Sequence, residues 1–178
     1  MTVPDDVLAG CRQNERAAQE RLYRLCYEPF LRLCLRYANN RDDAATILNK
    51  AFFNILTRIG QYNGEGALIG WMKRIVVNAA VDYVRANQRF RYHEPVENAE
   101  EMPGQSMPAD QELTQHDLLT MLHDLPYTSG AVFNLFAIEG YAHREIAQML
   151  GITETNSKWH LHNARKLLQK QLTDTATL

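Results

Sequence analysis

The sequence predicts an all-α protein made of two small helical domains joined by a flexible acidic linker. Three observations carry this prediction. Apolar residues recur at helical spacing through most of the chain, prolines and acids gather between residues 92 and 110, and the C-terminal part has a helix-turn-helix pattern. We therefore place the first domain at residues 1–91, the linker at 92–110 and the second domain at 111–178.

Length and charge distribution are compatible with this division. The chain has 178 residues, 46% of them hydrophobic, and a formal net charge of −2. This length suffices for one ordinary domain or two small ones. Residues 73–91 hold five basic side chains and one acid, whereas residues 94–124 hold eight acids and no Lys or Arg. Such a basic block can form a binding patch that the charge of the whole chain hides.

Neither a signal-peptide pattern nor an apolar run of membrane-spanning length is found in the sequence, which predicts a cytoplasmic location without membrane insertion. The three cysteines, Cys11, Cys26 and Cys34, form no CxxC or CxxH pair and are expected to be reduced core residues. A redox-sensing thiol or a thiol metal site is the alternative. We expect no metal, no cofactor and no small-molecule substrate.

Three helices are predicted before residue 61. The first runs from about Asp5 to Tyr27, Pro29 sits where a second begins, and the third extends from Asp42 to about Gly60. The apolar face of the third helix consists of Ala44, Ile47, Leu48, Ala51, Phe52, Ile55 and Ile59. Its opposite face holds Thr46, Asn49, Lys50, Phe53 and Thr57. The large ring of Phe53 indicates either a docking surface for another protein or a second packing contact within the domain.

A glycine-broken loop, residues 61–70, separates this helix from a fourth helix between Trp71 and about Arg89. At about 100° per residue, one stripe of the fourth helix collects an aromatic, an amide and several charged residues. They are Trp71, Arg74, Asn78, Asp82, Arg85 and Arg89. This combination suits a groove for nucleic-acid backbone and unstacked bases. A salt-bridged solvent face around Asp82 is the competing interpretation.

After the predicted linker, a helix from about Gln111 leads into the helix-turn-helix segment, which glycines break at Gly140 and Gly151. Thr153 is the expected N-cap of the last helix. The core side of that helix is expected to hold Ser157, Leu161, Ala164, Leu168 and Leu172. Its outward side holds Thr155, Lys158, Trp159, His162, Asn163 and Lys166, which suit contacts to phosphates and base edges. An ordinary solvated face is the alternative.

Three longer strings of the chain are distinctive. They are DDAATILNKAFFNIL at residues 42–56, YNGEGALIGWMKRIVVNAAVDYVR at 62–85, and LP followed by VFNLFAIEGYAHREIAQMLGIT, which ends at residue 153. These strings resemble the bacterial RNA polymerase sigma factors of the extracytoplasmic-function (ECF) type. The resemblance covers nearly the whole chain. Helix-turn-helix motifs alone are weakly diagnostic, whereas the W-x-x-R-I-x-x-N-x-A-x-D-Y-x-R string is much more specific.

This resemblance implies a transcription initiation factor that binds core RNA polymerase and directs it to promoters, with an anti-sigma factor as a further partner. By resemblance, the polymerase-binding residues are Thr46, Asn49, Lys50 and Phe53. The residues implied for the −10 element, where a flipped base is captured, are Tyr62, Asn63, Gly64, Trp71, Arg74, Asn78 and Arg85. Those implied for the −35 element are Thr155, Asn156, Lys158, Trp159, His162, Asn163 and Lys166. Promoter DNA is thus the expected nucleic-acid partner.

The chain departs from the family pattern at several of these positions. Thr46 stands where an acid is usual, Asn49-Lys50 replaces a Gln-Glu pair, and Asn163 replaces a frequent Arg. Gly130 also stands where an Arg is common, and Thr155-Asn156 replaces Gly-Thr. A charge reversal at Lys50 costs affinity where the partner surface is positive. The alternative is therefore a sigma-like DNA-binding regulator with weakened or lost polymerase binding. An enzyme is a further alternative, but the sequence contains no Gly-rich phosphate loop, HExxH motif or nucleophile elbow.

Overall fold

The computed structural model describes residues 2–91 and 115–176, and every regular element within these ranges is helical. The predicted all-α class is confirmed. The chain divides into two compact units, Met1–Tyr83 and Val84–Leu178. Each unit is considered by itself. The predicted linker at 92–110 and the expected helix start at Gln111 lie outside the described residues, so the domain boundaries drawn from the sequence stay predictions.

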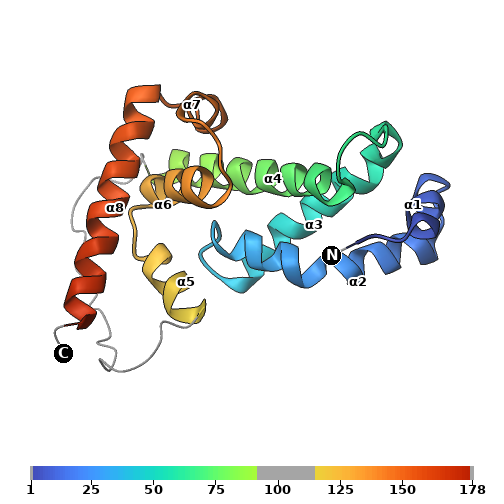
Figure 1. The fold of residues 1–178 in the computed structure, drawn as a ribbon, viewed down its shortest axis with the longest axis horizontal. Coiled ribbons are helices and arrows are strands. Elements are labelled where there is room, and N and C mark those ends of the chain that lie inside the picture. The colour runs from blue at the N-terminus through green and yellow to red at the C-terminus, as the bar shows by residue number, and fades with distance from the viewer. Residues whose placement is uncertain (1, 92–114, 177–178) are drawn as a thin grey trace. The chain divides into compact units, whose positions relative to one another are not determined.

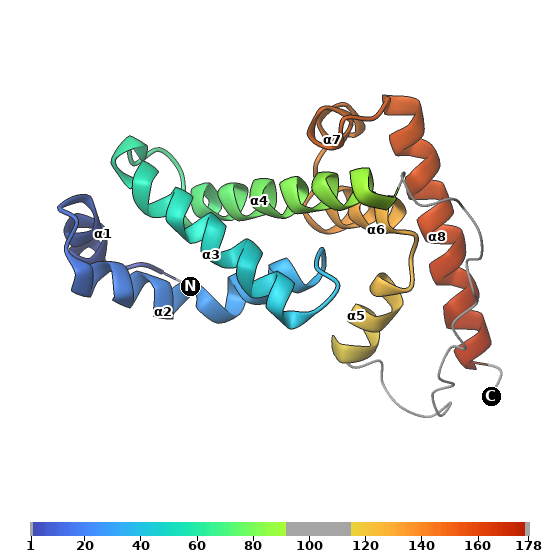
Figure 2. The same cartoon turned by 180° about the vertical axis from the view of Figure 1, so that it is seen from behind.

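The first part of the chain forms α1 (Asp5–Arg12), α2 (Arg16–Leu35), α3 (Arg41–Arg58), the short 3-10 turn η1 (Ile59–Gln61) and α4 (Leu68–Arg91). α1 packs on α2, and α2 packs on α3 (Figure 1). Both Figure 1 and the reverse view in Figure 2 place the connection between α3 and α4 at the same end of the unit as α1. This shared end contains the glycine loop.

The prediction of one helix from Asp5 to Tyr27 is wrong, because the chain turns between α1 and α2. Asn14 adopts a left-handed backbone with φ of 61°, which Asn tolerates better than most residues. Gly10 makes the turn possible, since a Cβ at this position would lie 2.6 Å from the Cβ of Ala18. The sequence has no proline at this break, and apolar residues keep a helical spacing across it, so the break cannot be predicted from the spacing.

The expectation that a new helix begins at Pro29 is also wrong, since Pro29 lies inside α2. A proline removes one N–H donor and crowds the carbonyl four residues earlier, here that of Leu25. Pro29 and Leu25 are both exposed, so water can reach the freed carbonyl. The helix therefore continues with its buried residues, among them Leu22 and Cys26, on the inner side.

The core of the first unit matches the apolar face predicted for α3. Every member of that face is buried, namely Ala44, Ile47, Leu48, Ala51, Phe52, Ile55 and Ile59. Asn40 caps α3 by accepting a hydrogen bond from the backbone N–H of Asp43 at 2.8 Å. The Tyr83 hydroxyl donates to Asp43 at 2.8 Å and so ties α4 to the start of α3.

The second unit contains α5 (Gln115–His123), α6 (Tyr127–Phe133), a π-helical turn η2 (Asn134–Ile138), α7 (His143–Leu150) and α8 (Glu154–Ala176). α5, α6 and α7 all pack against α8 (Figures 1 and 2). The predicted glycine breaks are confirmed: Gly140 and Gly151 adopt φ of 81° and 69°. The Gly151 conformation ends α7 and starts the turn that leads into α8.

The core of this unit lies where α6, α7 and α8 meet, and its apolar members include Val132, Leu135, Ile146, Leu150, Leu161 and Ala164. Two residues of α8 that were predicted to lie in the core are not buried. Leu168 is half-buried and Leu172 is exposed. They lie beyond the stretch of α8 that α6 and α7 cover. None of the described helices has the length and apolarity to cross a membrane.

Candidate nucleic-acid and polymerase interfaces

The outward face of α3 carries an exposed aromatic ring. Phe53 is 70% exposed, whereas the adjacent Phe52 is 3% exposed and packs edge-on against Tyr23 with ring centres 4.7 Å apart. The interpretation of Phe53 as a second packing contact within the domain is therefore wrong for the part of the chain that is described. Phe53 therefore presents its ring to solvent on an otherwise polar face of α3.

The other predicted polymerase-binding residues lie around Phe53. Thr46, Asn49 and Lys50 are all exposed on α3. The Tyr23 hydroxyl on α2 donates to Oδ1 of Asn49 at 2.9 Å, which fixes the amide of Asn49. The Thr46 hydroxyl donates to the backbone carbonyl of Asp42 at 3.0 Å. This face, which we call the α3 face (Thr46, Asn49, Lys50 and Phe53), thus presents one ring, one oriented amide and one ammonium group.

The glycine loop between α3 and α4 is built around Tyr62, which sequence reasoning assigned to DNA contact. Tyr62 is only 8% exposed, so its ring is almost fully covered, and its assignment to DNA contact stays a prediction. Its hydroxyl donates to the carbonyl of Gly66, and its ring packs against Trp71 with centres 5.9 Å apart. Tyr62 therefore supports the loop from inside.

The rest of the loop is exposed. Asn63 accepts a hydrogen bond from the N–H of Glu65 at 3.1 Å, which leaves its side-chain NH2 facing outward. Gly64 and Gly66 adopt φ of 87° and 75°, conformations that other residues rarely take. Nothing lies within 4 Å of where a Cβ would stand at either glycine, so the backbone is open to close approach by a ligand.

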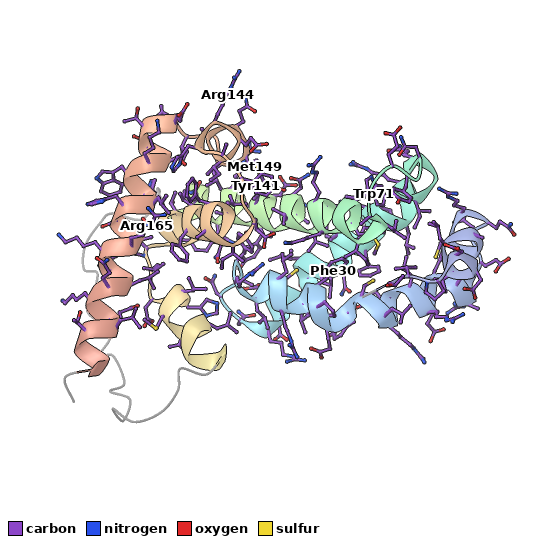
Figure 3. The ribbon with its side chains drawn as sticks, viewed as in Figure 1. Phe30, Trp71, Tyr141, Arg144, Met149 and Arg165 are labelled. Carbon is purple, nitrogen blue, oxygen red and sulfur yellow. The ribbon has the colours of Figure 1, made fainter. Side chains whose placement is uncertain are left out.

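The predicted basic stripe of α4 lies on one side of the helix. Arg74, Asn78, Asp82 and Arg85 are exposed, and Trp71 is half-buried at the helix start beside the loop (Figure 3). The side chain of Arg89 lies outside the described residues. The ion pairs among the described side chains do not include Asp82, so the interpretation as a salt-bridged face around that residue has no support there.

The outward face of α8 is confirmed as a polar face with one exposed indole. Trp159 is 60% exposed, and Thr155, Asn156, Lys158, His162 and Lys166 are exposed with it. Thr153 caps the helix by accepting from the N–H of Asn156 at 3.1 Å, as predicted. Lys158 pairs with Glu154 at 2.9 Å, which lowers the pKa of that carboxyl through their hydrogen bond and charge attraction.

Asn163 differs from the other predicted −35 residues because it is half-buried. Its side-chain NH2 lies 3.4 Å from the hydroxyl of Ser129 on α6, which is itself 3.0 Å from Nδ1 of His160. Burial lowers the pKa of His160 below its usual value. The ring of His160 also packs edge-on against Trp159 at 5.0 Å. A polar cluster of Ser129, His160 and Asn163 therefore supports the recognition side of α8 from below.

A second set of contacts holds α7 in its place relative to α8. His143 at the start of α7 stacks on Phe136 with ring centres 4.5 Å apart and lies 2.9 Å from the buried hydroxyl of Ser157. The guanidinium of Arg165 (labelled in Figure 3) lies over the ring of Phe136, 5.7 Å from the ring centre. Sequence reasoning placed Ser157 on the core side of the helix but missed His143, Phe136 and Arg165. Only the helical pairing of Ser157 with core positions hinted at a buried hydroxyl in need of a partner.

The three cysteines lie in the core of the first unit. Cys11, Cys26 and Cys34 are buried free thiols, and no group of three metal-ligating side chains occurs within the described residues. Burial raises the pKa of Cys26 to about 11 and that of Cys34 to about 12. A thiol in such surroundings stays protonated at neutral pH and reacts slowly. The expectation of reduced core cysteines is in agreement with these positions.

Comparison with known proteins assigns both halves of the chain. The family model for sigma-70 region 2 matches residues 22–90, and the model for sigma-70 region 4 matches residues 115–168. RNA polymerase sigma factor SigV of Bacillus subtilis is 27% identical over 146 residues, which are 82% of this chain and 86% of that protein. ECF RNA polymerase sigma factor SigE of Mycolicibacterium smegmatis is 27% identical over 161 residues, which are 88% of this chain and 59% of that longer protein.

The solved structures add the fold. A structure of the sigma factor RpoE in complex with the anti-sigma factor NepR from Bartonella quintana aligns with a TM-score of 0.54 at 17% identity, covering 86% of this chain and 96% of that one. Region 2 contains the α3 face, the glycine loop and the basic stripe of α4, and region 4 contains the helix-turn-helix. The chain belongs to the sigma-70 family of RNA polymerase sigma factors, within its ECF group.

Proposed function

We propose that this chain is a transcription initiation factor that docks on core RNA polymerase through the α3 face, captures the −10 element with the glycine loop and α4, and reads the −35 element with α8. The observation that carries this proposal is the exposure of three separate polar faces, each with an aromatic or glycine feature, at the positions that the two family models match. The factor catalyses no reaction of its own, since the chemistry belongs to the polymerase.

Docking on the polymerase rests on Phe53. An exposed aromatic ring flanked by polar groups is a usual hot spot in protein interfaces, where truncation costs about 2 kcal/mol or more. Lys50 supplies a positive charge, so the matching surface of the polymerase is expected to offer an acid or a neutral acceptor near it. The hydrogen bond from Tyr23 pre-orients Asn49, which reduces the entropy lost on docking.

The decisive experiment measures co-elution of the purified chain with bacterial core RNA polymerase, followed by transcription from a genomic promoter library. We expect co-elution and promoter-specific transcripts from the wild type. Phe53→Ala should weaken polymerase binding about 30-fold, which corresponds to about 2 kcal/mol. Leu25→Ala is the matched control, because Leu25 is an exposed apolar residue on α2 that points about 200° away from Tyr23.

The same experiment tests the alternative, a DNA-binding regulator without polymerase binding. The feature that favours this alternative is the exposed Lys50 at a position where the family usually has an acid. A folded wild-type chain that binds DNA but does not co-elute, while Lys50→Glu does co-elute, would establish the regulator. Co-elution of the wild-type chain and of Lys50→Glu with the polymerase would favour the function of an initiation factor.

Capture of the −10 element requires a pocket and a stacking surface, because extruding a base costs a few kcal/mol of stacking. The loop supplies the exposed amide of Asn63 and the open backbone of Gly64, and the first turns of α4 supply the half-buried ring of Trp71 and the exposed amide of Asn78. We expect Asn78→Ala to weaken promoter opening more than duplex binding. Equal losses in both assays would rule out a role in base capture.

An anti-sigma factor is the further partner that we propose. The aligned Bartonella quintana sigma factor was solved in complex with one, and the exposed Phe53 offers a surface that such a protein can cover in competition with the polymerase. The proposed place of action is the cytoplasm, where the polymerase and the promoter DNA are found. Competition between an isolated anti-sigma candidate and the polymerase, measured with the wild-type chain and with variants of the α3 face, would test this partner.

A further inference from the structure

The side chain of Arg12, at the last residue of α1, reaches the base of the glycine loop. Its Nη2 donates a hydrogen bond to the backbone carbonyl of Tyr62, a residue 50 positions further along the chain. This contact is partly buried, so water competes with it less than at an open surface. A hydrogen bond from a charged donor is stronger than one between neutral groups. Arg12 is therefore a strong link between α1 and the loop.

Tyr62 passes this link on to the rest of the loop. Its hydroxyl donates to the carbonyl of Gly66 across the loop, and its ring packs against Trp71 at the start of α4. A single residue thus joins α1, both ends of the loop and the first turn of α4. The backbone on which the exposed Asn63 and Gly64 are carried has its position set by these contacts.

The loop has few means of its own to hold this shape. Gly64 and Gly66 take positive φ with no atom near their Cβ positions, and glycines lose more conformational entropy on ordering than other residues. The one internal side-chain contact of its exposed tip is that of Asn63 with the N–H of Glu65. The order of the loop in the absence of DNA therefore depends on contacts with residues outside it, namely Arg12 and Trp71.

We propose that Arg12 is a positioning residue for −10 recognition, and that α1 orders the glycine loop for base capture through the Arg12–Tyr62 hydrogen bond. The inference rests on the proposed function of the loop. Pre-ordering lowers the entropic cost of holding an extruded base, so the effect belongs to promoter opening and not to polymerase docking or −35 binding. Arg12 itself touches no reacting atom and no base.

The test compares Arg12→Met with Arg21→Met in full-length protein. Met keeps an unbranched apolar stem and removes the donor. Arg21 is the matched control, because it also holds α1 in place, by an ion pair from α2 to Asp6 at 2.8 Å, and this pair does not involve the loop. With core polymerase and a promoter that carries a fluorescent adenine analogue in the −10 element, Arg12→Met should open the promoter about tenfold less well. Arg21→Met should match the wild type, and Arg12→Lys should recover part of the signal.

A second measurement needs no DNA or polymerase. The chain has two tryptophans, so in a Trp159→Phe background Trp71 becomes the only indole and reports on its contact with Tyr62. We expect Arg12→Met to increase quenching of Trp71 by acrylamide, and Arg21→Met to leave it unchanged. Unchanged quenching in Arg12→Met would overturn the proposal, whatever the promoter assay gives.

The two measurements separate the failure of the inference from the failure of the proposed function. If wild-type protein opens no promoter but Arg12→Met loosens Trp71, the loop is positioned as inferred and the proposed function is wrong. If Arg12→Met loosens Trp71 but opens promoters like the wild type, the positioning role in recognition is overturned. An equal loss of polymerase binding and promoter opening in Arg12→Met would also overturn it, because that pattern indicates a general loss of fold.

Discussion

The glycine loop and the outward face of α8 are both assigned to promoter DNA, yet they are built in different ways. The loop is held by residues from α1 and α4 that meet at Tyr62. The α8 face comes from one continuous helix whose inner side, with Ser157, Leu161 and Ala164, packs on the rest of the unit. One site depends on contacts between distant segments, whereas the other depends mainly on helical periodicity.

This difference decides how substitutions should act. At the loop, a change in a buried supporting residue shifts the exposed groups that it carries, so stability and function fall together. On α8, each exposed residue stands on a helix that its substitution leaves intact, so the loss is confined to that residue's own contact. The supporting cluster of Ser129, His160 and Asn163 is the exception on α8, because it couples the face to α6.

The largest effect is expected at Tyr62. Tyr62→Ala removes a buried ring, and such truncations cost about 3–5 kcal/mol of stability. We expect a large fall in the thermal midpoint of the first unit together with loss of promoter opening, measured by calorimetry and by an opening assay. A variant that keeps wild-type opening would contradict the view that the loop depends on its anchor.

Tyr62→Phe is the control that separates ring from hydroxyl. It keeps the packing on Trp71 and removes only the hydrogen bond to Gly66, for which a loss of about 1 kcal/mol is expected. Opening should fall modestly while the midpoint falls little. An equal defect in Tyr62→Phe and Tyr62→Ala would assign the whole effect to the hydroxyl.

The parts of the fold that follow from local pattern were predictable from the sequence. The apolar face of α3, the helix breaks at Gly140 and Gly151 and the capping role of Thr153 all agree with the structure, since each depends on residues a few positions apart. The exposure of Phe53 and Trp159 also follows from helical spacing. Two of the three proposed interfaces are therefore visible in the sequence as unusual rings on polar faces.

What the sequence did not show depends on tertiary contacts or on rare backbone conformations. The turn after α1 uses a left-handed Asn14 without proline or glycine at that position, and Pro29 is tolerated inside α2 because its side of the helix faces water. The burial of Tyr62 was not foreseen, because it depends on Trp71 and on a helix 50 positions earlier. No local pattern reports a contact of that range.

A smaller and more selective effect is expected at Trp159. Trp159→Ala removes a 60% exposed indole whose ring packs on that of His160, so the fold should be nearly unchanged. We expect −35 duplex binding to fall by about 1–2 kcal/mol, a loss within the range for a single base contact, while polymerase association stays intact. Fluorescence anisotropy with a −35 duplex checks this. Lost polymerase association would instead make Trp159 a structural residue.

The lysines of α8 should change the salt dependence of binding more than its specificity. Lys158→Gln and Lys166→Gln each remove one cation, so each should reduce the salt slope of DNA binding by about one unit where the lysine contacts a phosphate. Lys158 is already paired with Glu154, and its variant should therefore show the smaller change. Titration of −35 duplex binding across salt concentrations checks this order. The reverse order would show that Glu154 releases Lys158 on binding.

The smallest effect concerns pH and the cluster beneath α8. Burial lowers the pKa of His160 in the folded state, so the unfolded state binds the proton more readily. The contribution of neutral His160 is fully present above the ordinary histidine pKa, near 6.5, and is lost as pH falls through the lower folded value. Protonation also makes Nδ1 of His160 a donor. The hydrogen bond that the hydroxyl of Ser129 donates to neutral Nδ1 is then lost. Urea unfolding of a Trp71→Phe chain, followed by Trp159 emission, should show stability falling between pH 7.5 and 5, and the fall should be smaller in His160→Gln. The exposed His162→Gln is the control; equal slopes in the two variants would remove His160 from this role and leave the α8 face dependent on helical periodicity alone.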